Sequence, residues 1–139
     1  MASLRYLTAN EIKEYTEHLE AGYATLVPEG INVEHASRVE DFVVYTLKNA
    51  NNRVILGIYI GNHPQPFNGN PSIETTAVIG GFSAVSRRWI DDKSLFHGDI
   101  RISLLSGNGW PMIAHMSYDG LSRTDFNHAE KIIQSFKKR

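Results

Sequence analysis

Histidine and carboxylate side chains are the residues of this sequence that could bind a metal or transfer protons. Protein metal sites bring three or four ligands together, commonly with two of them at i, i+4 on a helix or i, i+2 on a strand. No two histidines of this chain have either spacing; they are His18, His35, His63, His97, His115 and His128. The sequence therefore predicts no metal site built on histidine.

Two of the histidines could instead act as catalytic bases. His115 lies in a segment with the alternation of a strand, and His97 could meet Asp92 or Asp99. A histidine held by a carboxylate can serve as a general base, although a structural hydrogen bond is the simpler role. A small hydrolase that uses His115, His97 and nearby acidic residues is accordingly one of three functions considered.

Asp91, Asp92 and Asp99 form a small acidic group around residues 93–98. Calcium sites place several oxygen ligands at regular offsets, and the EF-hand pattern is absent here. Helix capping or a solvated loop is the simpler interpretation, with a weak cation site as the alternative. The sequence also lacks a Walker phosphate loop, G-x-G-x-x-G, G-x-S-x-G and H-E-x-x-H. We therefore assign no catalytic residue and no cofactor.

The composition is that of one ordinary globular domain spanning residues 1–139. Of the 139 residues, 42% are hydrophobic and 21% are charged, and 14 basic residues offset 15 acidic ones to leave a net charge of −1. Nonspecific nucleic-acid binding needs a concentrated basic surface, so we expect no nucleic-acid partner. Cysteine is absent, which excludes disulfides, thiolate metal sites and thiol nucleophiles.

The sequence suggests no membrane insertion. No apolar stretch approaches the roughly 20 residues that span a bilayer. The first residues, "MASLR", lack the apolar segment of a signal peptide. The protein would be periplasmic if a signal peptide has been removed from its N-terminus, and cytoplasmic otherwise.

Helical patterns occur near both ends of the chain. Thr8 to Glu11 has the spacing of a capping box, and the apolar residues that follow predict a first helix over roughly residues 9–20. Ser122 or Thr124 would cap a last helix. Its apolar face comprises Phe126, Ala129, Ile132, Ile133 and Phe136, and its solvent face His128, Glu130, Lys131 and Gln134.

Between the helices, β-branched and aromatic runs separated by turn residues predict short strands. They cover residues 31–33, 41–48, 53–60, about 77–89, 100–105 and 111–118. Short turns join the second strand to the third, and the fifth to the sixth, as antiparallel hairpins. The expected fold class is α+β: a twisted antiparallel sheet of five or six strands with an N-terminal and a C-terminal helix packed on it.

A long proline-rich loop is predicted over residues 61–76, and such loops are uncommon in compact domains unless they are functional. Its prolines reduce the entropy that binding would cost, while its amides and single aromatic ring suit a protein interface. The predicted partner-binding residues are Asn62, His63, Gln65, Phe67, Asn68, Asn70, Trp89 and Trp110. The alternative is a crossover strap with Phe67 packed on the core, and tryptophans that belong to the core.

The segments "LVPEGINVEH", "DFVVYTLK" and "VILGIYIGNHP", with "HAEKIIQSF" near the end, resemble PsbP-like domains over roughly residues 20–137. This resemblance implies an α/β/α sandwich around a twisted antiparallel sheet. It also implies binding without catalysis, as in photosystem subunits, nuclear-import accessory factors and secretion chaperones. The stretches "LGIYIGNHP", "IGG" and "AEKIIQS" are similar to those of small bacterial cell-envelope proteins, among them immunity proteins against type VI secretion toxins.

Together these features predict a non-catalytic protein-binding domain. Its most specific form is an immunity or inhibitor protein that neutralises a secreted bacterial toxin with the 61–76 loop. The alternative is a chaperone or accessory subunit that binds a partner segment through an exposed apolar area of the sheet. The hydrolase is the third hypothesis.

Overall fold

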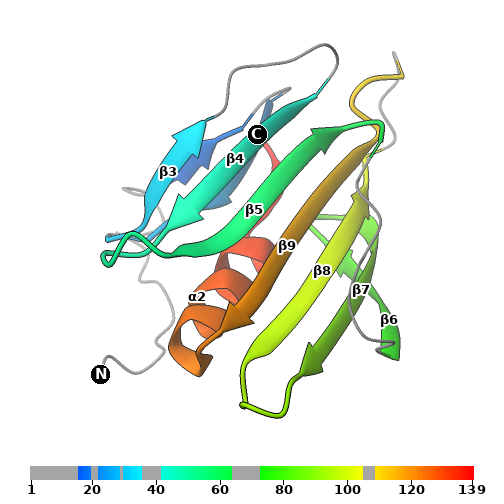
Figure 1. Ribbon diagram of the computed structural model, residues 1–139. Helices are drawn as coiled ribbons and strands as arrows, with labels where there is room; N and C mark the ends of the chain where they lie inside the picture. The colour runs from blue at the N-terminus through cyan, green and yellow to red at the C-terminus, as the bar shows by residue number, and fades with distance from the viewer. Residues whose placement is uncertain (1–15, 20–21, 29, 36–41, 64–72, 105–108) are drawn as a thin grey trace.

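The computed structural model describes residues 16–19, 22–28, 30–35, 42–63, 73–104 and 109–139. Two sheets account for most of this part of the chain (Figure 1). The larger is antiparallel, in the order β3-β4-β5-β9-β8-β7-β6. Its strands are β3 (Asn32–His35), β4 (Val43–Lys48), β5 (Val54–Gly61), β6 (Ile73–Ile79), β7 (Phe82–Ile90), β8 (Phe96–Ser103) and β9 (Ile113–Leu121). The smaller has the order β1-β2-β10, formed by β1 (Thr16–His18), β2 (Tyr23–Leu26) and β10 (Lys137–Lys138).

This mostly β architecture corrects the expected α+β fold with a helix at each end. Residues 16–18 lie in the predicted helix of 9–20, yet they form β1 and pair with β2, with Thr16 opposite Leu26. Residues 9–15 of that helix lie outside the described residues. The local capping pattern carries no information about a partner strand, and tertiary pairing overrides a weak helical preference.

The strand predictions need two further corrections. The predicted strand of about 77–89 is two strands, because Gly80 and Gly81 turn the chain with positive φ values of 57° and 87°. The predicted loop of 61–76 is shorter than expected, because β6 begins at Ile73. Its run "IETTAVI" is rich in β-branched residues and pairs with β7. The large sheet consequently has seven strands instead of five or six.

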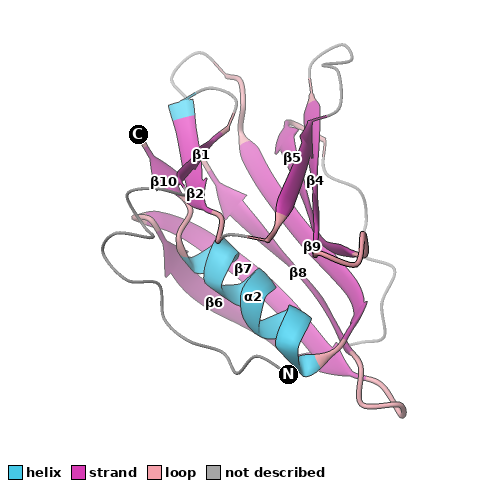
Figure 2. Ribbon diagram, turned by 90° about the vertical axis from the view of Figure 1, so that its left-hand side faces the viewer, coloured by secondary structure: helices cyan, strands magenta, loops and turns pink. Residues whose placement is uncertain are grey.

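The predicted C-terminal helix is confirmed as α2 (Arg123–Gln134). Ser122 is its N-cap, since the Asp125 N–H donates to Ser122 Oγ at 3.2 Å. Figure 2 shows α2 lying against one face of the large sheet. Its apolar side chains there include Ala129, Ile132 and Ile133, all buried. Within the described residues, no helix is long and apolar enough to cross a membrane.

Glu130 of α2 corrects the expected solvent face of this helix. Its carboxylate accepts two hydrogen bonds from Arg88, at 2.9 Å and 2.7 Å, and a third from the Tyr118 hydroxyl at 3.0 Å. Burial is the main reason that the pKa of Tyr118 is raised. The bonds to Arg88 and Tyr118 fasten α2 to β7 and β9, so Glu130 lies between helix and sheet.

The two faces of the large sheet differ because successive side chains of a strand point to opposite sides. The face under α2 is apolar and holds the core, with fully buried residues such as Leu47, Ile58, Ile100, Ile102 and Met116. We call the opposite side the open face, because no described helix covers it. The strand register places on it Tyr59, Arg87, Trp89, His97, Asp99, Arg101, His115, Ser117 and Asp119.

Candidate functional site

The polar side chains of the open face come from three adjacent strands. Trp89 of β7 lies opposite His97 of β8, and Arg87 lies opposite Asp99. On the other side of β8, His115 of β9 lies opposite Arg101. Residues that are far apart in the sequence therefore meet here, in two separate groups around His97 and His115.

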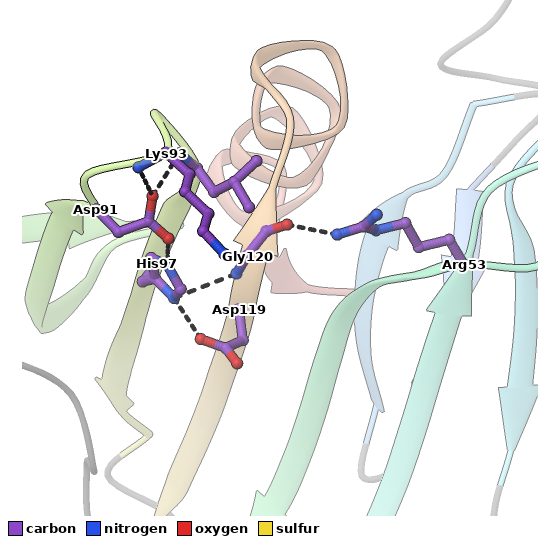
Figure 3. Close-up of polar contacts among 7 residues, drawn as sticks. Arg53, Asp91, Lys93, His97, Asp119 and Gly120 are labelled. Atoms are coloured by element: carbon purple, nitrogen blue, oxygen red, sulfur yellow. Dashed lines mark hydrogen bonds and ion pairs between the residues drawn. The ribbon is translucent and has the colours of Figure 1, made fainter.

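The first group, which we call the His97 clasp, consists of Trp89, Asp91, His97 and Asp119. Figure 3 shows His97 between the carboxylates of Asp91 and Asp119. His97 Nε2 lies 2.8 Å from Asp91 Oδ2, and Nδ1 is hydrogen-bonded to Asp119 Oδ1. The Trp89 ring stacks on the imidazole with a centroid distance of 3.9 Å and an interplanar angle of 7°. The clasp thus joins the end of β7, the start of β8 and the end of β9.

Asp91 also organises the turn between β7 and β8. Its Oδ1 accepts hydrogen bonds from the backbone N–H groups of Lys93, at 2.8 Å, and Leu95, at 3.0 Å. For Asp91 this agrees with the interpretation of the acidic group as loop structure. For Asp99 that interpretation is wrong, because Asp99 is a buried residue of β8. Within the described residues, no group of three or more His, Cys, Asp and Glu side chains could hold a metal ion. The true carboxylate partners of His97 are Asp91 and Asp119, and not Asp92 or Asp99.

The two carboxylates decide the charge of His97. Burial alone would lower its pKa, but the hydrogen bonds and negative charges of Asp91 and Asp119 outweigh this effect and raise it. The hydrogen bond from His97 in turn lowers the pKa of Asp91. When protonated, the ring donates one N–H to each carboxylate. It then has no lone pair with which to take a proton from a substrate.

The second group, which we call the Asp99 node, consists of Arg87, Asp99, Arg101 and His115. His115 Nε2 lies 2.6 Å from Asp99 Oδ2, and both side chains are buried, with exposed fractions of 8% and 2%. Arg87 donates to both oxygens of the same carboxylate, at 3.3 Å and 3.2 Å. Arg101 Nε lies 3.9 Å from it.

Charge pairing also decides the ionisation of Asp99. Burial would raise the pKa of this carboxyl, but the hydrogen bonds and positive charges of His115 and Arg87 outweigh burial and lower it. Asp99 is therefore held as a carboxylate beside two arginines and a histidine. The sequence could not indicate this pair, because Asp99 and His115 lie on different strands, 16 positions apart.

The hydrolase hypothesis needs a nucleophile or water site next to one of these histidines. His97 and His115 belong to separate groups with different carboxylate partners. Among the described residues, no serine, threonine or tyrosine hydroxyl is hydrogen-bonded to either ring. In the part of the chain that the structure describes, both histidines are hydrogen-bonded to carboxylates.

The predicted partner-binding residues divide between the two ends of the open face. Asn62 and Trp110 lie at the end where β5 stops and β9 begins, which we call the loop end (Figure 1). Asn62 Nδ2 donates to the Gly109 carbonyl, and the Met112 N–H donates to Asn62 Oδ1, both at 3.0 Å. The neighbouring His63 N–H donates to the hydroxyl of Tyr59 at 2.8 Å.

Trp89 belongs to the opposite end, where it forms part of the His97 clasp. The β8 positions from His97 to Ser103 separate the two ends, about 20 Å at the usual rise of an extended strand. Gln65, Phe67, Asn68 and Asn70 lie outside the described residues. Partner binding by these four residues stays a prediction. The same holds for the described residues of the set, which are Asn62, His63, Trp89 and Trp110.

No family model, curated protein or solved structure matches this chain. The α/β/α sandwich that the PsbP-like resemblance implies is wrong for the described residues, in which α2 covers one face of a mostly β fold. The family resemblance itself, and that to immunity proteins, stays a prediction from the sequence.

Proposed function

We propose that this protein is a non-catalytic binding domain that recognises a protein partner with the loop end of its large sheet. The observation that carries the proposal is the pair of hydrogen bonds from the Asn62 amide to the backbone at Gly109 and Met112. One side chain thereby ties together the chain that leaves β5 and the chain that enters β9. The segment after β5 and the segment before β9 both contain residues that the sequence predicts to bind a partner, namely Asn62, His63 and Trp110.

These hydrogen bonds favour binding because backbone that is already held at Asn62, Gly109 and Met112 loses less entropy when a partner docks. The backbone supports the same point, since the Leu104 N–H donates to the Met112 carbonyl at 2.9 Å. Leu104 itself is buried. The loop end therefore combines a rigid frame with amide, imidazole and indole groups, which are suited to a partner surface.

The chaperone alternative would require an extensive apolar area on the sheet. The large apolar side chains that are exposed in the described residues are Val54, Val78, Val85, Ile90 and Met112. Val78 and Val85 lie together at one hollow, whereas Val54, Ile90 and Met112 lie at or beside the ends of β5, β7 and β9. The centre of the open face instead carries the ion pairs of the Asp99 node. A polar surface at the loop end fits these features better than an apolar groove.

In its most specific form, we propose that the protein is an immunity or inhibitor protein and that it occupies the active site of a bacterial toxin. Support for this form comes from the sequence resemblance to small cell-envelope proteins and from the polar, proline-containing connection after β5. It implies a periplasmic location, where the protein would meet an incoming secreted toxin.

An affinity pulldown from lysate and envelope fractions of the source cells tests the proposal. The baits are the wild-type protein, Asn62→Ala, and a variant with residues 62–70 replaced by glycine and serine. Asn51→Ala is the matched control, because Asn51 is an exposed amide in the turn between β4 and β5, away from the loop end. Circular dichroism verifies that every bait is folded.

We expect the wild type and Asn51→Ala to capture the same partner, which Asn62→Ala retains weakly and the loop replacement loses. A partner with nuclease, hydrolase or pore-forming activity that the wild type abolishes would support the immunity form. Equal capture by all four baits would place the epitope elsewhere and overturn the proposal.

A further inference from the structure

Strand β6 ends the large sheet with an edge that no described strand covers. It pairs with β7 without a register shift, from Ile73 opposite Arg88 to Ile79 opposite Phe82. The side chains of Glu74, Thr76 and Val78 are exposed, Val78 by 73%. Figure 1 shows β6 at the far side of the sheet from β3.

The hairpin turn determines which backbone groups of β6 point outward. Gly80 and Gly81 form a two-residue connection, so Ile79 and Phe82 are the pair that exchanges both backbone hydrogen bonds. Pairs of this kind alternate along an antiparallel ladder. Counting back from Ile79, the N–H and C=O groups of residues 74, 76 and 78 therefore point away from β7.

The opposite edge of the sheet shows how such a strand is usually protected. β3 has only four residues, and Glu34 on it forms an ion pair with Lys48 of β4 at 3.0 Å. β6 has seven residues and contains no lysine, arginine or proline. Short length, charge and irregularity are the devices that discourage edge pairing, and β6 has none of them except Glu74.

We propose that β6 is a dimerisation edge to which the β6 strand of a second copy of this chain adds in antiparallel fashion, with Thr76 facing Thr76. The two copies are related by a twofold axis, so each uses its own β6 edge in the contact. No free β6 edge is left to bind a third copy, and the assembly stops at a dimer. All outward N–H and C=O groups of residues 74, 76 and 78 find partners. This joins two seven-stranded sheets into one.

We propose a second copy as the partner because, in this register, the side chains of one β6 strand are compatible with those of the other. Glu74 of one copy faces Val78 of the other, so no like charges are opposed. The aliphatic part of the glutamate can cover the exposed valine while its carboxylate stays in water.

A hollow beside Val78 provides space for that side chain. It has a volume of about 380 Å³ and is lined by Thr76, Ala77, Val78, Ser83, Ala84, Val85 and Ser103. Ser83 and Ser103 are the polar residues of this lining on β7 and β8. The surface is small, so the dimer should be weak and depend on concentration.

Sedimentation velocity over about 10 µM to 1 mM, the range of weak protein interfaces, tests the dimer. Thr76→Pro is the disrupting variant, because proline is tolerated on an edge strand where its missing N–H would face solvent. Thr76→Val is the matched control, because it leaves the backbone donor intact. We expect wild type and Thr76→Val to become dimeric with rising concentration, and Thr76→Pro to stay monomeric with unchanged circular dichroism.

The absence of cysteine from the chain permits an independent test by oxidative cross-linking. Facing residues of a hydrogen-bonded antiparallel pair have Cα atoms about 5.5 Å apart, within the range that a disulfide bridges. Thr76→Cys should therefore form a covalent dimer, while Ser83→Cys, exposed on the same face of β7, should not. A wild type that stays monomeric at 1 mM, or equal cross-linking of the two cysteine variants, would overturn the proposal.

Discussion

The His97 clasp and the Asp99 node contain the same chemical pair, a histidine and a carboxylate, on the same face of adjacent strands. In the node, Asp99 and His115 are both buried, and Arg87 supplies a second counter-charge. In the clasp, His97 bridges two carboxylates, and the side chain of Asp119 is 90% exposed. The node is a buried ion-pair network, whereas the clasp lies at the rim of the sheet.

This difference in burial determines what each pair can do. A buried charge that loses its partner is left in a medium that solvates it poorly, so the node should be required for folding. In the clasp the side chains of His97 and Asp91 are 12% and 20% exposed, but the third member, Asp119, is solvated by water when its partner is lost. The clasp should therefore contribute less than the node. The clasp is therefore the pair that can respond to pH without unfolding the protein.

The largest expected effect comes from breaking the node. Asp99→Asn keeps the shape of the side chain but removes the negative charge beside Arg87 and His115. We expect the free energy of unfolding to fall by about 3–5 kcal/mol, the usual cost of breaking a buried ion pair. Urea denaturation measures it, with Asp92→Asn, an exposed acidic residue, as the control. A loss below about 1 kcal/mol would show that water already solvates Asp99.

Breaking the clasp should cost less. His97→Ala removes the hydrogen bonds to Asp91 and Asp119 and the stacking contact with Trp89. We expect a loss of about 1.5–3 kcal/mol, the range for hydrogen bonds to charged groups. His128→Ala on α2 is the matched control and should be nearly neutral. A loss as large as that of Asp99→Asn would contradict the ranking of the two pairs.

The pH dependence of stability should separate the two pairs by sign. His97 has a folded-state pKa above the ordinary value of 6.5, so its contribution is complete below pH 6.5 and is lost as the pH rises through the folded-state pKa. Asp99 has a pKa below its ordinary value of 3.8, so its contribution is present above pH 3.8 and is lost as the pH falls through the folded-state pKa.

Urea denaturation of wild type and His97→Gln between pH 5 and 9 measures the His97 term directly. We expect the stability difference between them to be largest near pH 6 and to shrink at the alkaline end. A difference that grows with pH would contradict the raised pKa. The same measurement on wild type and Asp99→Asn between pH 2 and 5 tests the Asp99 term. Here we expect the stability difference to be largest near pH 5 and to shrink as the pH falls.

The smallest expected effect concerns Asp119. Asp119→Asn removes one of the two carboxylates on His97, and its exposure limits the loss of stability to less than about 1 kcal/mol. The pKa of His97, followed by NMR, should nevertheless fall. In the neutral ring, Nδ1 can accept the N–H of Gly120, which lies 3.2 Å away. An unchanged pKa would show that Asp91 alone holds the proton on His97.

Local elements were predictable from the sequence because their signals lie in contiguous residues. The Ser122 cap and the apolar period of the last helix predicted α2, and turn residues predicted the β4–β5 and β8–β9 hairpins. The strands β1, β2 and β10 were missed. They are short, and β10 pairs with β2 across more than 100 positions, as Lys137 opposite Ala24 shows.

The candidate site was predictable only as a set of residue types. The sequence indicated histidines, acidic residues and a polar connection after β5, and it excluded cysteine chemistry. Only the tertiary structure decided that Asp119 meets His97, that Asp99 meets His115, and that Asn62 reaches Gly109. These contacts depend on strand order and register, which place β9 between β5 and β8. Side-chain alternation and turn chemistry act over a few residues, whereas strand order results from burying one apolar face as a whole.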